Sequence, residues 1–471
     1  MSKKKIGLVL GPLAFCSIYF ILPIQGLSHA GLGVLASAVW ISIWWVFEAV
    51  PLAVTALLPI VLFPILGSMP ISETTSSYGH KFIFLFTGGF MLSIAIEKWN
   101  LHKRIALNII ALIGTKPEQI IFGFMAATAF LSMWISNTAT TVMLLPVALA
   151  VYKEYNSKEF GTPLMLSIAY SASIGGMATL IGTPPNLILA GVIQDSYGIE
   201  LSFSKWFSFG FPISIALLTI AWFYLCRFAY PLKSIKTNVE NLNSIEKQLK
   251  DLGKMSREEK YILVIFTLAA LSWICRSFVL QKIVPGIDDT IIAISAAILL
   301  FIIPGKSKKT RLLEWEDLKS LPWGILLLFG GGLALAKGFQ YTDLATWIGA
   351  QVTGIDGLIL LVQILISIAV VNFLTEITSN MAITAMLLPI MVSVSASLNL
   401  NPYILLVSTT VAASCAFMLP TATGPNAIVF SSGTIKMEDM VRKGFFMNLI
   451  SILILTLFTY YLVPIIWSKI N

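Results

Sequence analysis

The chain has 471 residues, of which 57% are hydrophobic and only 11% are charged. That leaves too little polar surface to cover a water-soluble globule of this size, so the composition indicates an integral membrane protein. The formal net charge of +8 could suggest a nucleic-acid partner, but the basic residues sit in short loops beside apolar segments rather than on one amphipathic face. Their placement therefore reports on membrane topology.

Apolar runs close to the ~20 residues that cross a bilayer as a helix recur along nearly the whole chain. They exclude a single-anchor protein and predict an all-α polytopic membrane protein. The first run, after Lys3 to Lys5, is predicted to be an uncleaved span, because Phe15 is too large for the residue before a processing site. Eleven spans are predicted, at residues 6–26, 30–49, 52–69, 82–97, 163–192, 206–230, 260–281, 287–304, 323–340, 401–430 and 444–467.

Two apolar stretches do not fit this count, at 121–152 and 357–400. Each is too long for one simple crossing and carries a Ser-Asn pair near its middle. With a cytoplasmic N-terminus, 25 of the 31 Lys and Arg fall in cytoplasmic segments, provided that both flanks of the first stretch lie on the same side. Each stretch is therefore predicted to be a re-entrant hairpin with a polar tip at membrane depth, and the C-terminus is predicted to lie outside.

A Gly-Gly span, a Ser-Asn hairpin and a proline-broken span occur in this order twice. The Ser-Asn pairs begin at Ser136 and Ser379, 243 residues apart, and the motifs IGTPPN and TATGPN are 240 apart. By the charge pattern the first hairpin opens to the cytoplasm and the second to the outside, so the two copies are expected to be inverted in the membrane. The predicted divisions are a first helix at 1–29, repeat 1 at 30–230, a cytoplasmic linker at 231–259 and repeat 2 at 260–471, with broken helices at 163–192 and 401–430.

The two proline motifs predict where the site lies. Pro184 and Pro185 remove two backbone donors and must interrupt their helix, and Gly424-Pro425 does the same in the second copy. Broken helices expose half-helix N-termini, which attract anions, and unwound carbonyls, which attract cations. Irregular backbone at membrane depth must also line a polar cavity or be buried in protein. A binding site is therefore predicted where the two hairpin tips and the two breaks meet.

The residue types at these places indicate the chemistry. Neither hairpin and neither broken span contains Lys, Arg or His, so a bound anion would need cations bound alongside it. Hydroxyl, amide and carbonyl oxygens suit Na⁺, whereas a proton would need a titratable carrier, and only Glu376 offers one there. Glu48 is the other acidic residue near the core, although it lies near a span end and also fits a role in anchoring a turn. This reasoning predicts Na⁺-coupled transport of an anion and no cofactor.

Other classes of function fit less well. An intramembrane enzyme would need catalytic groups at membrane depth, but the histidines His29, His80 and His102 lie at loops or span ends. A channel is also disfavoured, because two opposed hairpins closing on one site suit alternating access better than a continuous pore. The four cysteines lack CxxC spacing and are predicted to be small buried residues.

The chain resembles the divalent anion/sodium symporter family over nearly its whole length. The motifs that carry the resemblance are WWVFEAVPLAVTALLP, SNTATTVMLLP, GGMATLIGTPPN, TEITSN and LPTATGPNAIVF. It implies a homodimer in the cell inner (plasma) membrane that carries C4-dicarboxylates such as succinate, fumarate and malate together with Na⁺, by an elevator motion. A sodium-independent dicarboxylate exchanger of the same fold is the alternative, and the absence of basic residues in the site favours the symporter.

The resemblance also implies roles for individual residues. The substrate would be bound by Ser136, Asn137, Thr138, Thr183, Pro184, Ser379, Asn380, Met381, Thr423 and Gly424. One sodium site would use Ser132, Ser136, Asn137 and Gly182, and the other Thr375, Thr378, Asn380 and Ala422. Two positions depart from the family's pattern, because Met381 stands where many members have Thr and Gly424 replaces the first proline of the second proline motif. Both departures are expected to bear on which dicarboxylate is preferred.

Overall fold

The computed structural model describes residues 2–155, 157–230, 232, 243–306, 310–351 and 358–467. Within these ranges the chain is helical, and the only extended pairing is an isolated bridge between Pro304 and Arg311. Eight helical segments are long and apolar enough to cross a membrane, namely Lys3–Ile21, His29–Phe47, Ile71–Lys98, Phe203–Ala229, Arg257–Ile283, Trp323–Tyr341, Asn380–Ser397 and Met437–Ile466. The protein is thus an all-α polytopic membrane protein, as the composition predicted.

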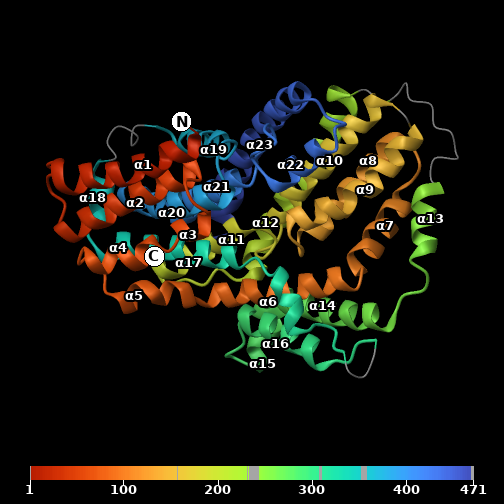
Figure 1. Ribbon diagram of the computed structural model, residues 1–471, viewed down its shortest axis with the longest axis horizontal. Coiled ribbons are helices and arrows are strands. Elements are labelled where there is room, and N and C mark those ends of the chain that lie inside the picture. The colour runs from red at the N-terminus through yellow and green to blue at the C-terminus, as the bar shows by residue number, and fades with distance from the viewer. Residues whose placement is uncertain are drawn as a thin grey trace.

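The first predicted spans form a group of helices at one end of the molecule (Figure 1). Ser28 caps the second of them by accepting a hydrogen bond from Gly31 N at 3.1 Å, and Glu48 ends it in the left-handed region with φ of 47°. The predicted span 52–69 consists of two short helices rather than one continuous rod. The elements are α1 (Lys3–Cys16) with η1 (Ser17–Ile21), α2 (His29–Phe47), α3 (Leu52–Thr55), α4 (Leu58–Ile65), α5 (Ile71–Ser76) and η2 (Ser77–Gly79).

A long apolar helix, α6 (Lys81–Lys98), is followed by α7 (Leu101–Ile113), which the sequence analysis did not predict. Asn100 adopts a left-handed conformation with φ of 57° and turns the chain between the two helices. Arg104 in α7 reaches Glu259 of α14 (Arg257–Cys275) with an Nε to Oε1 distance of 2.8 Å. Helix α7 has one apolar face rather than a continuous apolar run, which is why a search for membrane spans overlooks it.

The predicted hairpin at 121–152 is built from α8 (Pro117–Ser132) and α9 (Asn137–Tyr155), so both of its arms are longer than expected. The predicted hairpin at 357–400 corresponds to α19 (Leu360–Leu374) and α20 (Asn380–Ser397), and its residue 357 lies outside the described part of the chain. In both cases the first helix ends a few residues before the Ser-Asn pair, at Ser132 and Leu374, and a new helix begins at the Asn. We call the non-helical residues 133–136 and 375–379 tip 1 and tip 2.

The two proline motifs interrupt helices, as predicted. Residues 178–183, which we call break 1, separate α10 (Lys158–Met177) from α11 (Pro184–Tyr197). Residues 414–423, break 2, separate α21 (Pro402–Ala413) from α22 (Gly424–Ser431). The observed segments 158–197 and 402–431 replace the predicted boundaries 163–192 and 401–430.

An Asn near the start of each second half-helix satisfies the carbonyls that its break leaves free. Asn186 Nδ2 donates to the carbonyls of Gly176 and Thr179 at 3.3 and 2.8 Å. In break 2, Asn426 Nδ2 donates in the same way at 3.1 and 3.0 Å, to the carbonyl oxygens of residues 416 and 419. Buried backbone carbonyls that no helix pairs therefore find partners in both breaks.

The remaining helices enclose these four segments. In Figure 1, α8 and α9 lie beside α10, and α20 lies beside α2 and α18 (Leu344–Gln351). Helix α10 is almost wholly enclosed, because every residue from Phe160 to Met177 is buried. The other elements are α12 (Phe203–Phe223), η3 (Tyr224–Ala229), α13 (Asn243–Asp251), η6 (Arg276–Leu280), α15 (Gln281–Ile283), α16 (Asp289–Ile302), η7 (Trp315–Ser320), α17 (Trp323–Tyr341) and α23 (Met437–Ile466).

A buried ion pair joins three of these elements at one end of the bundle. Arg276, only 2% exposed, contacts Glu200 through Nη2 at 2.8 Å and Asp289 through Nε at 2.8 Å. Asp289 Oδ2 also accepts a hydrogen bond from Phe203 N at 2.7 Å. The cluster fixes the starts of α12 and α16 against η6.

Candidate substrate and ion site

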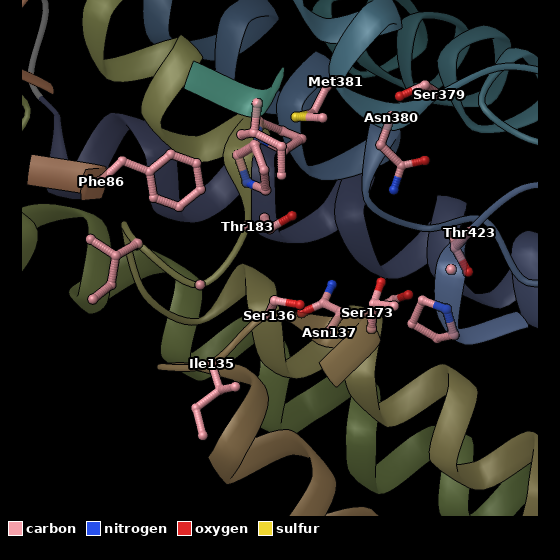
Figure 2. Close-up of a pocket in the computed structure, with 18 of the residues that line it drawn as sticks. Phe86, Ile135, Ser136, Asn137, Ser173, Thr183, Ser379, Asn380, Met381 and Thr423 are labelled. Carbon is pink, nitrogen blue, oxygen red and sulfur yellow. The ribbon is translucent and has the colours of Figure 1, made fainter. Parts of the chain in front are cut away.

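The two tips and the two breaks surround one cavity of about 350 Å³. Figure 2 shows Ser136 and Asn137 on one wall and Ser379 and Asn380 on the opposite wall. All ten residues that the sequence analysis assigned to the substrate line this cavity, namely Ser136, Asn137, Thr138, Thr183, Pro184, Ser379, Asn380, Met381, Thr423 and Gly424. Among the described residues of the lining, none is Lys, Arg or His.

Four helices begin at the wall of the cavity. Their first residues are Asn137 in α9, Pro184 in α11, Asn380 in α20 and Gly424 in α22, and all four line the cavity. A helix N-terminus carries about half a positive charge from the aligned peptide dipoles and, except at proline, unpaired N–H groups. Pro184, Pro185 and Pro425 have no N–H, so at α11 and α22 the dipole contributes more than hydrogen-bond donation. Four such ends directed at one space make it favourable for an anion without any basic side chain.

Behind tip 1, oxygen atoms gather around a single hydroxyl group. Ser132, the last residue of α8, is fully buried, and its Oγ lies 2.6 Å from Asn137 Oδ1 and 2.8 Å from the carbonyl oxygen of Ala172. A hydroxyl has one hydrogen and so can satisfy only one of these two acceptors. The cluster therefore holds more oxygen lone pairs than hydrogens, which is the ligand chemistry of a hard cation.

Gly176 leaves a space beside the same oxygens. A Cβ atom at this position would lie 2.7 Å from Asn137 Oδ1 and 3.2 Å from the carbonyl oxygen of Gly182. Both distances are shorter than ordinary van der Waals contacts of a carbon atom, so only glycine fits here without a shift. Three of the residues predicted for the first sodium site, Ser132, Asn137 and Gly182, thus contribute oxygens to one small region.

Tip 2 repeats the arrangement. Thr375 Oγ1 lies 2.7 Å from Asn380 Oδ1 and 2.9 Å from the carbonyl oxygen of Ala413, so again one hydroxyl hydrogen faces two acceptors. Thr378 is buried, and its Oγ1 has no hydrogen-bond partner among the described residues. Ala422 lines the cavity, whereas Ser132, Thr375 and Thr378 lie behind its wall. The predicted ion residues are therefore split between the cavity surface and the layer beneath it.

Each tip is tied to the break of its own repeat, but by different groups. In repeat 1, Thr179 Oγ1 of break 1 donates to the carbonyl oxygen of Met133 in tip 1 at 2.5 Å. In repeat 2, Glu376 of tip 2, only 3% exposed, accepts hydrogen bonds from three successive backbone N–H groups of break 2 and from Asn448 Nδ2. The Glu376 carboxylate is therefore a structural clamp between tip 2 and break 2, whereas the sequence analysis singled it out only as a titratable group.

The remaining wall of the cavity is apolar. Phe86 and Phe90 of α6 lie there with Ile135, Ile181 and Met381, and Figure 2 shows Phe86 and Ile135 on the side away from Thr423. The sequence analysis did not assign Phe86, Phe90, Ser173 or Glu48 to the site, yet all four line the cavity. Phe86, Phe90 and Ser173 lie near repeated motifs, which does not say which face of a helix points inward, and Glu48 was noted only as an acidic residue near the core.

The chain matches known transporters over almost its full length. Residues 2–468 match the family described as the sodium:sulfate symporter transmembrane region. The sodium-dependent dicarboxylate transporter SdcS of Staphylococcus saprophyticus is 45% identical over 474 residues, which cover 98% of this chain and 91% of that protein. SdcS of Staphylococcus aureus strain USA300 is 45% identical over 488 residues, which cover 99% of this chain and 94% of the relative.

Two solved transporter structures share the fold. The Alcanivorax borkumensis YdaH transporter aligns with a TM-score of 0.64 and 12% identity, over 93% of this chain and 99% of that one. MtrF of Neisseria gonorrhoeae aligns with a TM-score of 0.56 and 12% identity, over 96% and 98% of the two chains. At this identity the likeness concerns the fold alone, and the family assignment rests on the sequence matches. The chain therefore belongs to the divalent anion/sodium symporter family and is a membrane transporter rather than an enzyme.

Proposed function

We propose that this protein is a secondary active transporter that carries C4-dicarboxylates such as succinate, fumarate and malate together with Na⁺. The observation that carries the proposal is the convergence of four helix N-termini, those of α9, α11, α20 and α22, on one cavity that contains polar side chains but no basic one. Helix dipoles, amides and hydroxyls can orient two carboxylates, but they cannot neutralise two full charges. Co-bound cations supply the missing positive charge.

The two oxygen clusters behind the tips are the proposed sodium sites. Each contains a hydroxyl group, an Asn amide oxygen and a main-chain carbonyl oxygen, around Ser132 in one repeat and Thr375 in the other. In each cluster the single hydroxyl hydrogen can satisfy only one of the two acceptors. A cation between these oxygens would replace the unsatisfied contact with a favourable one. The substrate anion would lie at the positive N-terminal ends of the helix dipoles. Na⁺ would lie at the negative C-terminal ends of the adjoining helices, where carbonyl oxygens are exposed.

The names of the close relatives support the same substrate class, because both SdcS proteins are described as sodium-dependent dicarboxylate transporters. We also propose the features that the family resemblance implies, namely an elevator-type movement and a homodimer in the plasma membrane. Support for a moving unit comes from the bonds that tie each tip to its own break. The oligomeric state can be measured by light scattering on the detergent-purified protein.

The connection of the cavity to Glu48, Leu52 and Ile325 supports an inward-open state. Under the proposed topology these residues lie at the cytoplasmic ends of α2, α3 and α17. The N-terminus lies on the same side, and Lys3 Nζ donates to the carbonyl oxygen of Ile377 in tip 2 at 3.5 Å. A Glu48→Cys variant should react with an impermeant thiol reagent from the cytoplasmic side and not from the outside.

Uptake of radiolabelled succinate into proteoliposomes tests the function directly. An inward Na⁺ gradient should drive uptake above the equilibrium level, and replacing Na⁺ by K⁺ or choline should abolish it. Uptake that is indifferent to this replacement would refute sodium coupling. Stimulation by internal dicarboxylate in the absence of Na⁺ would instead identify the exchanger of the same fold.

A further inference from the structure

Each repeat forms one half of the cavity, and the two halves come into contact at Gly424, which has no side chain. Gly424 begins α22, and a Cβ atom at this position would meet Thr138 Oγ1 of α9 far inside the 3.0 Å that real Cβ atoms keep. The Cβ and Cγ2 atoms of Thr138 would both be 3.4 Å away, which is an ordinary contact. The close approach therefore depends on glycine at position 424 and on the hydroxyl group of Thr138, not on its methyl group.

The equivalent junction in the other half of the site is built from different residues. The repeat offsets of 243 and 240 pair Thr138 with Met381 and Gly424 with Pro184. All four residues line the cavity, and α9 packs on α22 as α11 packs on α20. One junction thus brings a hydroxyl against a bare Cα atom, whereas the other has a thioether and a proline ring. At the Thr138–Gly424 junction the two halves approach so closely that a Cβ atom at position 424 would not fit.

This junction joins the groups that would hold the two ends of a substrate. Thr138 follows Asn137 at the start of α9 and moves with tip 1. Gly424 is coupled to Asn380 of tip 2, because α20 packs on α21 and the second break leads from α21 into α22. The steric contact between Thr138 and Gly424 therefore sets the minimum distance between tip 1 and tip 2.

We propose that the Thr138–Gly424 contact sets the length of the dicarboxylate, so that the cavity selects unbranched four-carbon diacids over longer ones. The inference rests on the proposed function, because it takes the two tips as the holders of the two carboxylates. A Cβ atom at position 424 would push the halves apart by about 1 Å before normal contact is reached. One added methylene lengthens a diacid by about 1.2 Å, since three bonds of an extended chain span ~3.6 Å.

The test measures competition against Na⁺-driven succinate uptake in proteoliposomes by malonate, succinate, glutarate and adipate. In the wild type, the inhibition constant of glutarate should exceed that of succinate at least tenfold. Gly424→Ala should lower this ratio at least fivefold. Thr138→Ser in the same chain should restore the ratio, because the serine hydroxyl can rotate to the place of the lost Cγ2, 3.4 Å from the new Cβ. Gly286→Ala, with no heavy atom within 4 Å of its Cβ, is the matched control.

Thr138→Ala keeps the proposal testable if Gly424→Ala does not fold, because it removes atoms from the contact and cannot clash. It lets tip 1 and tip 2 come closer together, so the ratio of the glutarate to the succinate constant should rise above the wild-type value. A ratio that stays at the wild-type value in these variants, or one that Thr138→Ser fails to restore, would overturn the length selection. Failure of the wild type to take up succinate in a sodium gradient would overturn the proposed function instead, and is recognised because no ratio can then be measured.

Discussion

Changing Glu376 to Gln tests what holds the second break in shape. Its Oε1 accepts hydrogen bonds from Phe417 N at 2.8 Å, Met418 N at 2.9 Å and Asn448 Nδ2 at 2.8 Å, and its Oε2 accepts one from Leu419 N at 2.9 Å. The amide of Gln has the same shape but only one oxygen. In its better orientation it keeps the three bonds at Oε1 as neutral bonds, and its NH₂ group then faces the N–H of Leu419.

The cost follows from these four contacts. A buried backbone N–H left without a partner costs about 1–3 kcal/mol, and each of the three other bonds loses about 1 kcal/mol when its acceptor is no longer charged. Part of this loss is recovered, because the variant no longer buries a charge away from water. We expect the free energy of unfolding to fall by about 2–4 kcal/mol, a large fraction of what stabilises a typical domain.

Thermal unfolding of the detergent-purified variant and the Na⁺ concentration for half-maximal uptake are the two measurements. Both should change for Glu376→Gln, because break 2 carries Ala422 and lies against the oxygen cluster of Thr375. Glu316→Gln is the matched control, since Glu316 is 71% exposed and pairs with Lys319 on the surface. If Glu376→Gln were as stable as this control and needed no more Na⁺, the clamp role would be wrong.

Three further substitutions test the site and its support. Gly176→Ala places a methyl group 2.7 Å from Asn137 Oδ1, so the Na⁺ concentration for half-maximal uptake should rise at least tenfold while the protein still folds. Met381→Thr adds a hydroxyl to the cavity wall and should change the relative inhibition by succinate, malate and larger anions; identical competition profiles would show that Met381 does not face the substrate. Arg276→Met leaves Asp289 buried without its cation and should destabilise the protein by about 3–5 kcal/mol, which Asp289→Asn in the same chain should partly reverse in thermal unfolding.

The location of the candidate site could be predicted because the hydrocarbon core of the bilayer holds no water to pair with polar groups. Polar residues such as Ser136 and Asn137 in an apolar stretch must face something other than lipid, and a second copy at Ser379 and Asn380 shows that their presence is not incidental. Consecutive prolines after Thr183 interrupt a helix whatever surrounds them. These local rules predict that the tips and the breaks meet at one cavity, and the ten residues that the family resemblance implied for the substrate all line it.

The rest of the site depends on contacts between distant residues, which local rules do not reveal. Glu376 is an isolated acidic residue in the sequence, and its role becomes visible only when its donors, 41 to 43 residues away in break 2, are brought to it. Gly176 resembles any packing glycine until the Asn137 amide is seen against its Cα atom. Helix α7 was missed for a simpler reason, because its single apolar face lacks the continuous apolar run that marks a membrane span.

The ties between tips and breaks constrain how the site can open. Separating tip 1 from break 1 would break the Thr179 bond to Met133, and separating tip 2 from break 2 would remove three backbone donors from Glu376. Displacing a tip and its break together breaks none of these bonds. The joints that flex during a transport cycle are therefore expected outside the binding unit, where the left-handed residues Asn100 and Asn399 already turn the chain sharply.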